Sequence, residues 1–221
     1  MPETLTLTPT EALDVLEKRA RAIMAMPGRG LLAIAGGPGT GKSTLAALLV
    51  ARLAGNDPRQ AALVPMDGFH MRHAKLEALG MVADKGAAHT FEGEAFLAFV
   101  RTLKSAEMTV IVPGYSRAIE DVVENAGSVA PEVKLLVIEG NYLLLPDEPW
   151  LRLKDLFDLS VYLEVPREVV QARLLKRHGE HGLFSEERNR AHVERVDLGN
   201  YDMVTTSRSR ADLAIDLTTS K

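Results

Sequence analysis

The sequence contains no cysteine, which excludes disulfides, thiolate chemistry and cysteine-based zinc sites. It also lacks an apolar run of roughly 18 residues, the length at which a segment becomes a candidate for a membrane-spanning helix. The first residues include Glu3 and no long apolar stretch, unlike a secretory signal peptide. We therefore expect a cytoplasmic protein that does not insert into a membrane.

A strong excess of charge of either sign is absent too. The formal net charge of −4 argues against a general nucleic-acid binder, which is normally basic, so we expect no nucleic-acid partner. Hydrophobic residues make up 46% and charged residues 25% of the chain, values that are ordinary for a globular protein. The length of 221 residues suits one α/β domain that spans residues 1–221.

A glycine-rich segment at residues 36–44 fits the phosphate-binding pattern G-x-x-x-x-G-K-[ST]. Glycines allow backbone angles closed to other residues, so successive N–H groups can turn towards phosphate oxygens. Lys42 adds positive charge near the β- and γ-phosphates, Ser43 offers a hydroxyl to Mg²⁺, and the following helix points its positive end at the anion. The candidate nucleotide-binding residues of this loop are Gly37, Gly39, Thr40, Gly41, Lys42, Ser43 and Thr44.

The pattern of apolar residues predicts alternating strands and helices, and hence a doubly wound parallel α/β sheet of the P-loop NTPase type. The predicted strands are 31–35, 61–65, 109–112, 134–140, 159–165 and 211–217. The predicted helices are 9–26 (within an N-terminal region of about residues 1–30), 44–54, 91–104, 167–178 and 186–197. The remaining segments are expected to be a loose start at 1–7, a loop at 81–90, and a loop or flap at 118–132.

Acidic residues follow two of the predicted strands. Asp67 comes just after strand 61–65, at the edge where open α/β sheets bind ligands, although a turn or N-cap aspartate would look the same. Glu139 ends strand 134–140, where an acid can orient Mg²⁺ or its water. We therefore expect Ser43 and Glu139 to form a metal site.

His70 and His73 have a spacing that is seen in metal sites. No further ligands cluster around them in the sequence, which favours hydrogen-bonded or surface histidines. His70 is nevertheless a candidate substrate contact, because it follows Asp67 so closely. Polar residues, among them Tyr115 and Arg117, also come after strand 109–112.

Two basic helices near residues 173–195 suggest a helical lid over the site. Arg173 and Arg177 lie on the first helix and Arg195 on the second, where arginine could reach a transferring phosphoryl group. The alternative is that most of these arginines form solvated pairs within their helices. We expect one or two of them to be functional.

Together these motifs resemble the P-loop kinases that include uridine kinase, phosphoribulokinase and bacterial type I pantothenate kinase. Beyond the P-loop, the similar segments are MDGFH at 66–70, KG at 85–86 with TF at 90–91, PGYSRAIEDV at 113–122, IEGNY at 138–142, and Asn200 with RSRAD at 208–212. Within this group the chain looks most similar to a bacterial branch associated with nucleosides or fructose transport.

The resemblance implies a role for each matching residue. Asp67 would accept the proton of a substrate hydroxyl or orient that hydroxyl, and Lys42 and Arg173 would act on the transferring phosphoryl group. The substrate contacts would be Tyr115, Arg117 and Asn200, and the Mg²⁺ ligands Ser43 and Glu139. Beside these, we expect His70 to contact substrate because it follows Asp67 closely, and Arg177 of the basic helix to join the P-loop in binding ATP. The family also leaves a homodimer open.

The sequence departs from the family at the substrate loop. Pantothenate kinases tend to have histidine where Arg117 stands, and an aromatic-rich pocket is not evident with 5% aromatic residues. Arg117 would suit an acceptor that carries a phosphate or carboxylate, or would pair with a nearby acid. The phosphate acceptor thus stays open between a sugar such as fructose, a nucleoside and a pantothenate-like alcohol.

The alternative to an ATP-dependent kinase is an ATP-binding sensor of a metabolite with little or no phosphotransfer. A guanine-nucleotide switch normally carries N-K-x-D and a transport ATPase a signature such as L-S-G-G-Q, and the sequence has neither. A strand-end base such as Asp67 serves a kinase and has no use in a switch.

Replacing Lys42 by alanine tests the P-loop assignment. Lys42→Ala should weaken both ATP binding and turnover, because it removes the positive charge that meets the phosphates. Nucleotide affinity is measured by titration and turnover by ADP release. If neither changed, the segment at 36–44 would not be a phosphate-binding loop.

Overall fold

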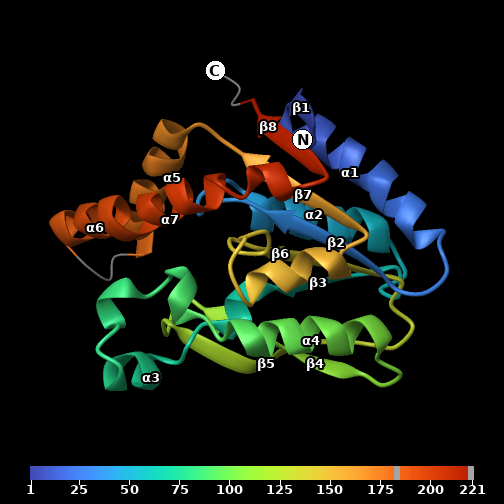
Figure 1. The fold of residues 1–221 in the computed structure, drawn as a ribbon, viewed down its shortest axis with the longest axis horizontal. Coiled ribbons are helices and arrows are strands. Elements are labelled where there is room, and N and C mark those ends of the chain that lie inside the picture. The colour runs from blue at the N-terminus through green and yellow to red at the C-terminus, as the bar shows by residue number, and fades with distance from the viewer. Residues whose placement is uncertain (182–184, 219–221) are drawn as a thin grey trace.

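A six-stranded parallel sheet forms the centre of the computed structural model, which describes residues 1–181 and 185–218 (Figure 1). The strands lie in the order β1 (Glu3–Leu7), β8 (Leu213–Leu217), β7 (Leu159–Glu164), β2 (Gly30–Ala35), β6 (Leu135–Gly140) and β3 (Ala61–Pro65). Every residue of β2 and β6 is buried, which explains their continuous apolar sequences. The predicted doubly wound parallel sheet is confirmed.

One face of the sheet is covered by α1 (Pro9–Met24) and α2 (Lys42–Ala54). Thr8 and Glu11 begin α1 with the capping box that their spacing predicts, since each side chain accepts a hydrogen bond from the other residue's backbone N–H. The buried side of α1, including Leu13 and Leu16, packs with α2 against β2, β6 and β7.

The opposite face is covered by α4 (Gly93–Ser105), the 3₁₀ segment η4 (Trp150–Leu156) and a two-stranded antiparallel hairpin. Phe96 of α4 and Trp150 of η4 lie in this layer, with ring centroids 6.3 Å apart. Figure 1 shows α4 and the hairpin together on the side of the sheet away from α1.

The hairpin corrects two expectations. Residues 109–112 were expected to be a strand of the buried sheet, but they begin β4 (Val110–Ser116), which pairs with β5 (Asp121–Val129) outside it. Residues 118–132 were expected to be a loop or flap, and most of them form β5. The polar sequence of β5 follows from its position, because most of its residues are exposed.

The first residues are also ordered, contrary to the expected loose start. Residues Glu3–Leu7 form β1, an edge strand in register with β8, where Leu5 pairs with Ile215. Leu5 and Leu7 pack against the core layer beneath α1. Threonine alternates with leucine here, a pattern of period two that suits a half-exposed edge strand.

The region of the predicted lid contains α5 (Arg167–His181), α6 (Glu186–His192), the π turn η5 (Val193–Asp197) and α7 (Leu198–Thr205). The expected helix at 186–197 therefore ends earlier, and five of its residues form a wider π turn. Residues 182–184 of the expected lid lie outside the described residues. An apolar cluster that includes Leu174, Val193 and Tyr201 packs α5, η5 and α7 together.

Short elements connect β3 to α4. They are the 3₁₀ segments η1 (Met66–Phe69), η2 (Val82–Asp84) and η3 (Ala88–Thr90) and the helix α3 (His73–Ala78). The expected loop at 81–90 thus contains two 3₁₀ turns. The last short element is the 3₁₀ turn η6 (Arg208–Arg210), just before β8.

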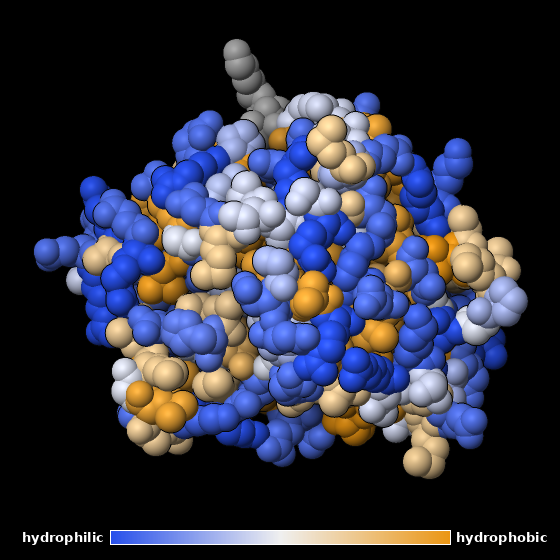
Figure 2. All heavy atoms as spheres, viewed as in Figure 1, coloured by the Kyte–Doolittle hydropathy of each residue, from blue (hydrophilic) through white to orange (hydrophobic). Residues whose placement is uncertain are grey.

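The outer surface is mainly hydrophilic on the face drawn in Figure 2, where apolar residues occur in small groups. Within residues 1–181 and 185–218, no helix has the length and apolar character required to traverse a bilayer.

Arg29 joins the start of β2 to two other parts of the fold. Its half-buried side chain donates hydrogen bonds to the backbone carbonyls of Leu103, Ala130, Pro131 and Val133. Arg29→Met removes all of these donors, and we expect a loss of about 2–3 kcal/mol from the free energy of unfolding. Urea-induced unfolding measures this difference.

Arg21→Met is the matched control. Arg21 makes an exposed ion pair with Glu17 on α1, so its loss should change stability little. Equal losses in the two variants would show that the four carbonyl contacts of Arg29 contribute nothing special.

Candidate active site

The P-loop connects β2 to α2 as the sequence predicts. Gly41 precedes α2 with a φ of +90° and Gly39 has a φ of +76°, backbone conformations that favour glycine. A side chain at Gly39 would come within 3.2 Å of both Val170 and Leu174 of α5. The loop therefore lies directly against α5.

Strand register brings the two predicted acids to the P-loop. Glu139 of β6 pairs with Ile34 of β2 on one side and with Pro65 of β3 on the other. Asp67 follows two residues after Pro65, in η1. The ends of three adjacent strands thus place Asp67, Glu139 and the P-loop at one edge of the sheet.

Lys42 and Glu139 are charged residues in a buried setting, with exposures of 8% and 4%. Burial lowers the pKa of the Lys42 ammonium, and the carboxylates of Glu139 and Asp67 oppose that shift. Burial raises the pKa of Glu139, and the charge of Lys42 opposes it. Each charge therefore favours the charged form of the other.

The Ser43 hydroxyl donates a hydrogen bond to Glu139 Oε2 at 3.0 Å. A hydroxyl and a carboxylate are the hard oxygen ligands that Mg²⁺ prefers, so the residues present fit this ion. Thr40 has a different position, because its buried hydroxyl donates to the carbonyl of Gly37 at 2.8 Å. The Thr40 side chain therefore braces the loop from inside.

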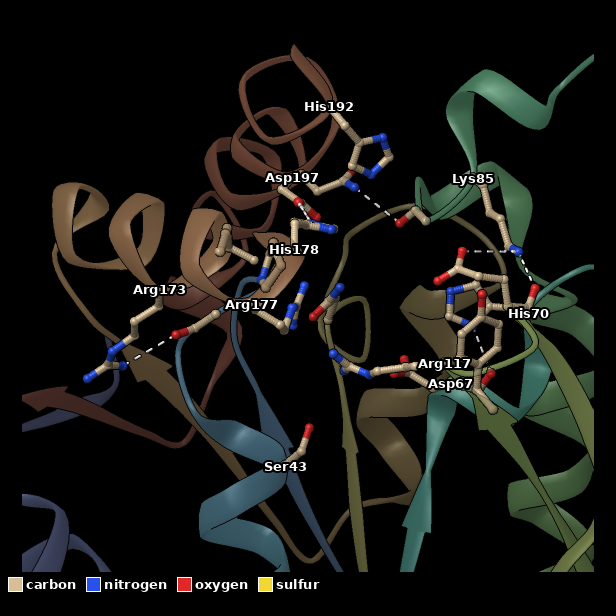
Figure 3. Close-up of a pocket in the computed structure, with 18 of the residues that line it drawn as sticks. Ser43, Asp67, His70, Lys85, Arg117, Arg173, Arg177, His178, His192 and Asp197 are labelled. Carbon is tan, nitrogen blue, oxygen red and sulfur yellow. Dashed lines mark hydrogen bonds and ion pairs between the residues drawn. The ribbon is translucent and has the colours of Figure 1, made fainter. Parts of the chain in front are cut away.

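A cavity of about 600 Å³ opens in front of the P-loop. Of the predicted residues, those that line it are Gly39, Gly41, Lys42, Ser43, Thr44, Asp67, His70, Tyr115, Arg117, Arg173, Arg177 and Asn200. Gly37, Thr40 and Glu139 lie behind this lining. Figure 3 shows Asp67 and Arg117 across from Ser43, with Arg177 between them and the α5–α7 segment.

His70 lies in an aromatic stack beside Asp67. Its ring centroid is 4.0 Å from that of Phe91 and 4.5 Å from that of Tyr115. Its Nδ1 is 2.8 Å from the carbonyl oxygen of Asp67. Burial lowers the pKa of His70, against the opposing effect of the Asp67 charge, so the ring is held towards its neutral form.

The tip of the hairpin holds Lys85. Its ammonium donates to the carbonyl of Glu120, lies 3.6 Å from the Glu120 carboxylate and 5.4 Å from the centre of the Tyr115 ring. Glu120 has a φ of +53°, a left-handed conformation in the turn between β4 and β5. Burial raises the pKa of Tyr115, which keeps its hydroxyl protonated.

The two predicted arginines of α5 have different surroundings. Arg173 is exposed and donates to the carbonyl of Gly39 at 3.3 Å. Arg177 is half-buried, and burial together with the charge of Arg117 lowers its pKa. Figure 3 shows Arg177 directed inwards and Arg173 on the outer side of the P-loop.

Asn200 of α7 is tied to another part of the wall. Its Nδ2 donates to the carbonyl of Gly86 at 3.1 Å, and the Tyr142 hydroxyl donates to the same carbonyl at 2.5 Å. These bonds connect α7, the loop after β6 and the segment 82–90. Asn200 therefore shapes the cavity wall as well as lining it.

Several lining residues were not among the predicted site residues. They include Lys85, Glu120, Asn141, His178, His192 and Asp197. Lys85 and Asn141 belong to segments that resemble the family, and that signal could have found them. His178, His192 and Asp197 left no such signal, because a helix gives no reason to bring these positions together.

The family model of the phosphoribulokinase / uridine kinase family matches residues 31–220 of the chain. The chain belongs to this family. The match begins at β2 and includes the P-loop and all the residues of the cavity, so the recognised motifs and the observed site coincide.

Individual relatives support the same assignment. A Schizosaccharomyces pombe protein with the provisional name uridine kinase C227.14 is 34% identical over 211 residues, which cover 91% of this chain and 89% of that one. A pantothenate kinase of Leifsonia xyli is 36% identical over 154 residues, 68% of this chain but 46% of its own length. A solved structure from Silicibacter sp. TM1040, provisionally titled a fructose transport system kinase, has a TM-score of 0.82 and 37% identity, and covers 91% of this chain and 98% of that one.

These relatives share the kinase name, and the chain is accordingly a phosphotransferase of the small-molecule kinase type. The predicted P-loop kinase fold is confirmed as well. The names differ in the substrate that they mention, so they leave the acceptor of this chain undecided.

The buried setting of His70 predicts a pH dependence of stability. Because its native pKa lies below the ordinary value of about 6.5, the unfolded chain binds a proton more readily as the pH falls below that value. As the pH falls from about 6.5 to the native pKa of His70, this residue should therefore lower the free energy of unfolding, by up to about 1.4 kcal/mol per pH unit. Urea unfolding across this range should give a smaller slope for His70→Gln than for the unmodified protein.

His89→Gln provides the comparison, since His89 is exposed and lies outside the cavity lining. The change in slope should be smaller in His89→Gln than in His70→Gln. If the free energy of unfolding of His70→Gln varied with pH as steeply as that of the unmodified protein, the burial of His70 would not be the origin of the pH dependence.

Proposed function

We propose that this protein transfers the γ-phosphoryl group of ATP to a hydroxyl group of a small metabolite. The observation that carries the proposal is the convergence of Asp67 with the P-loop residues Lys42 and Ser43 on one cavity. A phosphate-binding loop alone would suit many nucleotide-binding proteins. A carboxylate facing it from a neighbouring strand end adds the base or hydroxyl-orienting group that a kinase uses.

The nucleotide side of the cavity is assigned to the P-loop. Backbone N–H groups of the loop would surround the phosphates, with Lys42 supplying charge and Arg177 approaching from α5. Ser43 and Glu139 would hold Mg²⁺, which supplies further charge neutralisation when bound. Phosphoryl transfer depends mainly on positioning and electrostatic stabilisation, and this set of residues provides both.

The acceptor side is assigned to η1, the hairpin and α7. Asp67 would accept or orient the substrate hydroxyl proton, and His70, Tyr115, Arg117 and Asn200 would contact the rest of the acceptor. Arg173 already donates a hydrogen bond to the Gly39 carbonyl of the P-loop. A modest movement of its side chain would bring it to the phosphoryl group that is transferred. The inward position of Arg177 makes it a second candidate for that role.

The acceptor is proposed to be a sugar such as fructose, a nucleoside or a pantothenate-like alcohol. Each class corresponds to the name of a relative. The mixed lining of the cavity, with the His70 and Tyr115 rings beside Arg117 and Lys85, suits an acceptor that has both a flat or apolar part and polar groups.

Asp67→Asn tests the proposed role of the carboxylate. Asparagine keeps the size of the side chain but cannot accept the proton, so turnover should fall at least about a hundredfold while ATP binding stays nearly intact. The measurement is ADP release with Mg-ATP across sugars, nucleosides, pantothenate and their phosphorylated or carboxylated relatives, with nucleotide affinity determined in parallel.

Asp155→Asn, an exposed acid on η4 away from the cavity, should behave like the unmodified protein. Unchanged turnover in Asp67→Asn would remove Asp67 from the mechanism. If the unmodified protein binds ATP but no acceptor stimulates ADP release, the results would favour the metabolite-sensor alternative.

A further inference from the structure

Three side chains with metal-binding atoms meet at the lid side of the cavity. They are His178 of α5, His192 at the end of α6 and Asp197 at the end of η5, and each can offer one ligand atom within 4.8 Å of the other two. His178 Nε2 lies 2.9 Å from Asp197 Oδ2, and the two imidazole rings have centroids 5.5 Å apart. Figure 3 shows the three residues grouped above Arg177.

The π turn creates this grouping. In an α-helix, residues five positions apart lie about 140° apart around the axis, so His192 and Asp197 would point to different sides. Residues 193–197 instead form a π turn, which closes over five residues and brings His192 and Asp197 to the same side. Single π turns occur frequently at functional sites, and neither the nucleotide nor the acceptor role proposed above makes use of this one.

The surroundings favour ligands that are ready to bind. Asp197 is 9% exposed, and His178 and His192 are half-buried, yet all three line the cavity. Among the residues that the structure describes, the His192 ring has its ring contact with His178 but no hydrogen bond.

We propose that His178, His192 and Asp197 form a binding site for a divalent transition-metal ion such as Zn²⁺. Two imidazoles and one carboxylate are a donor set that such ions accept, with the remaining coordination positions open towards the cavity. This set differs from the oxygen pair Ser43 and Glu139, which suits Mg²⁺. The proposal does not rest on the kinase assignment, because metal binding is measured without substrate.

Two features set how the ion would be accommodated. The hydrogen bond between His178 and Asp197 would be replaced by two bonds to the metal, and side-chain rotations would bring ligand atoms within 4.8 Å onto one ion. Of the nearby positively charged side chains, Arg195 donates hydrogen bonds to the Asp84 carboxylate and the Ala83 carbonyl, so its guanidinium is directed towards the 82–90 segment. Arg177 is a further positive charge nearby, and the Asp197 carboxylate partly offsets it.

The test is a titration of metal-free protein with Co²⁺, whose visible absorption reports low-coordinate binding by nitrogen and oxygen ligands. Excess Mg²⁺ is present throughout to occupy oxygen-only sites, and nucleotide is left out. We expect one Co²⁺ per chain, displaced by one Zn²⁺. His192→Ala should weaken the affinity at least about tenfold, with a thermal melt of the metal-free variant unchanged because the ring makes no hydrogen bond to the described residues.

Asp197→Asn is the second variant, since asparagine keeps the shape and can still bond to His178 while losing the ligand charge. It should weaken Co²⁺ binding even if His192→Ala folds poorly. His73→Ala is the matched control, an exposed histidine that lines the same cavity from α3 but lies outside the cluster. Its affinity should equal that of the unmodified protein.

Three results would overturn the proposal. They are no saturable Co²⁺ signal in the unmodified protein, equal affinities in the unmodified protein and in both cluster variants, or the same weakening in His73→Ala as in His192→Ala. In each case the cluster would be a hydrogen-bonded pair, His178 with Asp197, with His192 beside it.

Discussion

The burial of a lysine and a glutamate near each other, at one edge of a parallel sheet, is the constraint on which this site depends. Lys42 and Glu139 each favour the charged form of the other, because burial lowers the pKa of Lys42 and raises that of Glu139 while the opposite charge counteracts both shifts. The strand register places Glu139 beside Ile34 near the end of β2, and the P-loop that follows β2 leads into α2, whose first residue is Lys42. Removing either partner would leave an uncompensated buried charge.

The cavity has one wall built into the sheet and others made from peripheral segments. The P-loop and Glu139 belong to β2, α2 and β6, which lie in the two main core layers. Arg117 and Tyr115 come from the hairpin, Lys85 and Gly86 from the segment before α4, and the remaining wall from α5 to α7. In the proposed function, nucleotide recognition therefore belongs to the core of the fold, while acceptor choice depends on the peripheral segments.

Sequence reasoning was sufficient where a buried strand or a phosphate loop imposes its own pattern. The strands around the P-loop, the capping box of α1, and the positions of Asp67 and Glu139 at strand ends all follow from local chemistry. It failed at β1 and at the hairpin, where strands are partly exposed and read as polar segments. The structure of those regions depends on the strands with which they pair, and the local sequence does not specify that pairing.

The site itself was predictable to the same degree. Residues carried by motifs were found, and most of them line the cavity. His178, His192 and Asp197 were missed because their meeting depends on the π turn after His192, which no periodicity in the sequence indicates. Asn200 was expected to contact substrate, and nothing in the sequence indicated that its amide also donates to the Gly86 carbonyl, a tertiary contact across 114 positions.

The fate of the γ-phosphoryl group tests the central claim most directly. ATP labelled at that group would be incubated with the protein, Mg²⁺ and a mixture of small hydroxyl-bearing metabolites, and the label followed by mass spectrometry. The account predicts that the label appears in a phosphate monoester of one acceptor class. Label that remains in ATP, or is released only as inorganic phosphate while ATP is bound, would contradict it.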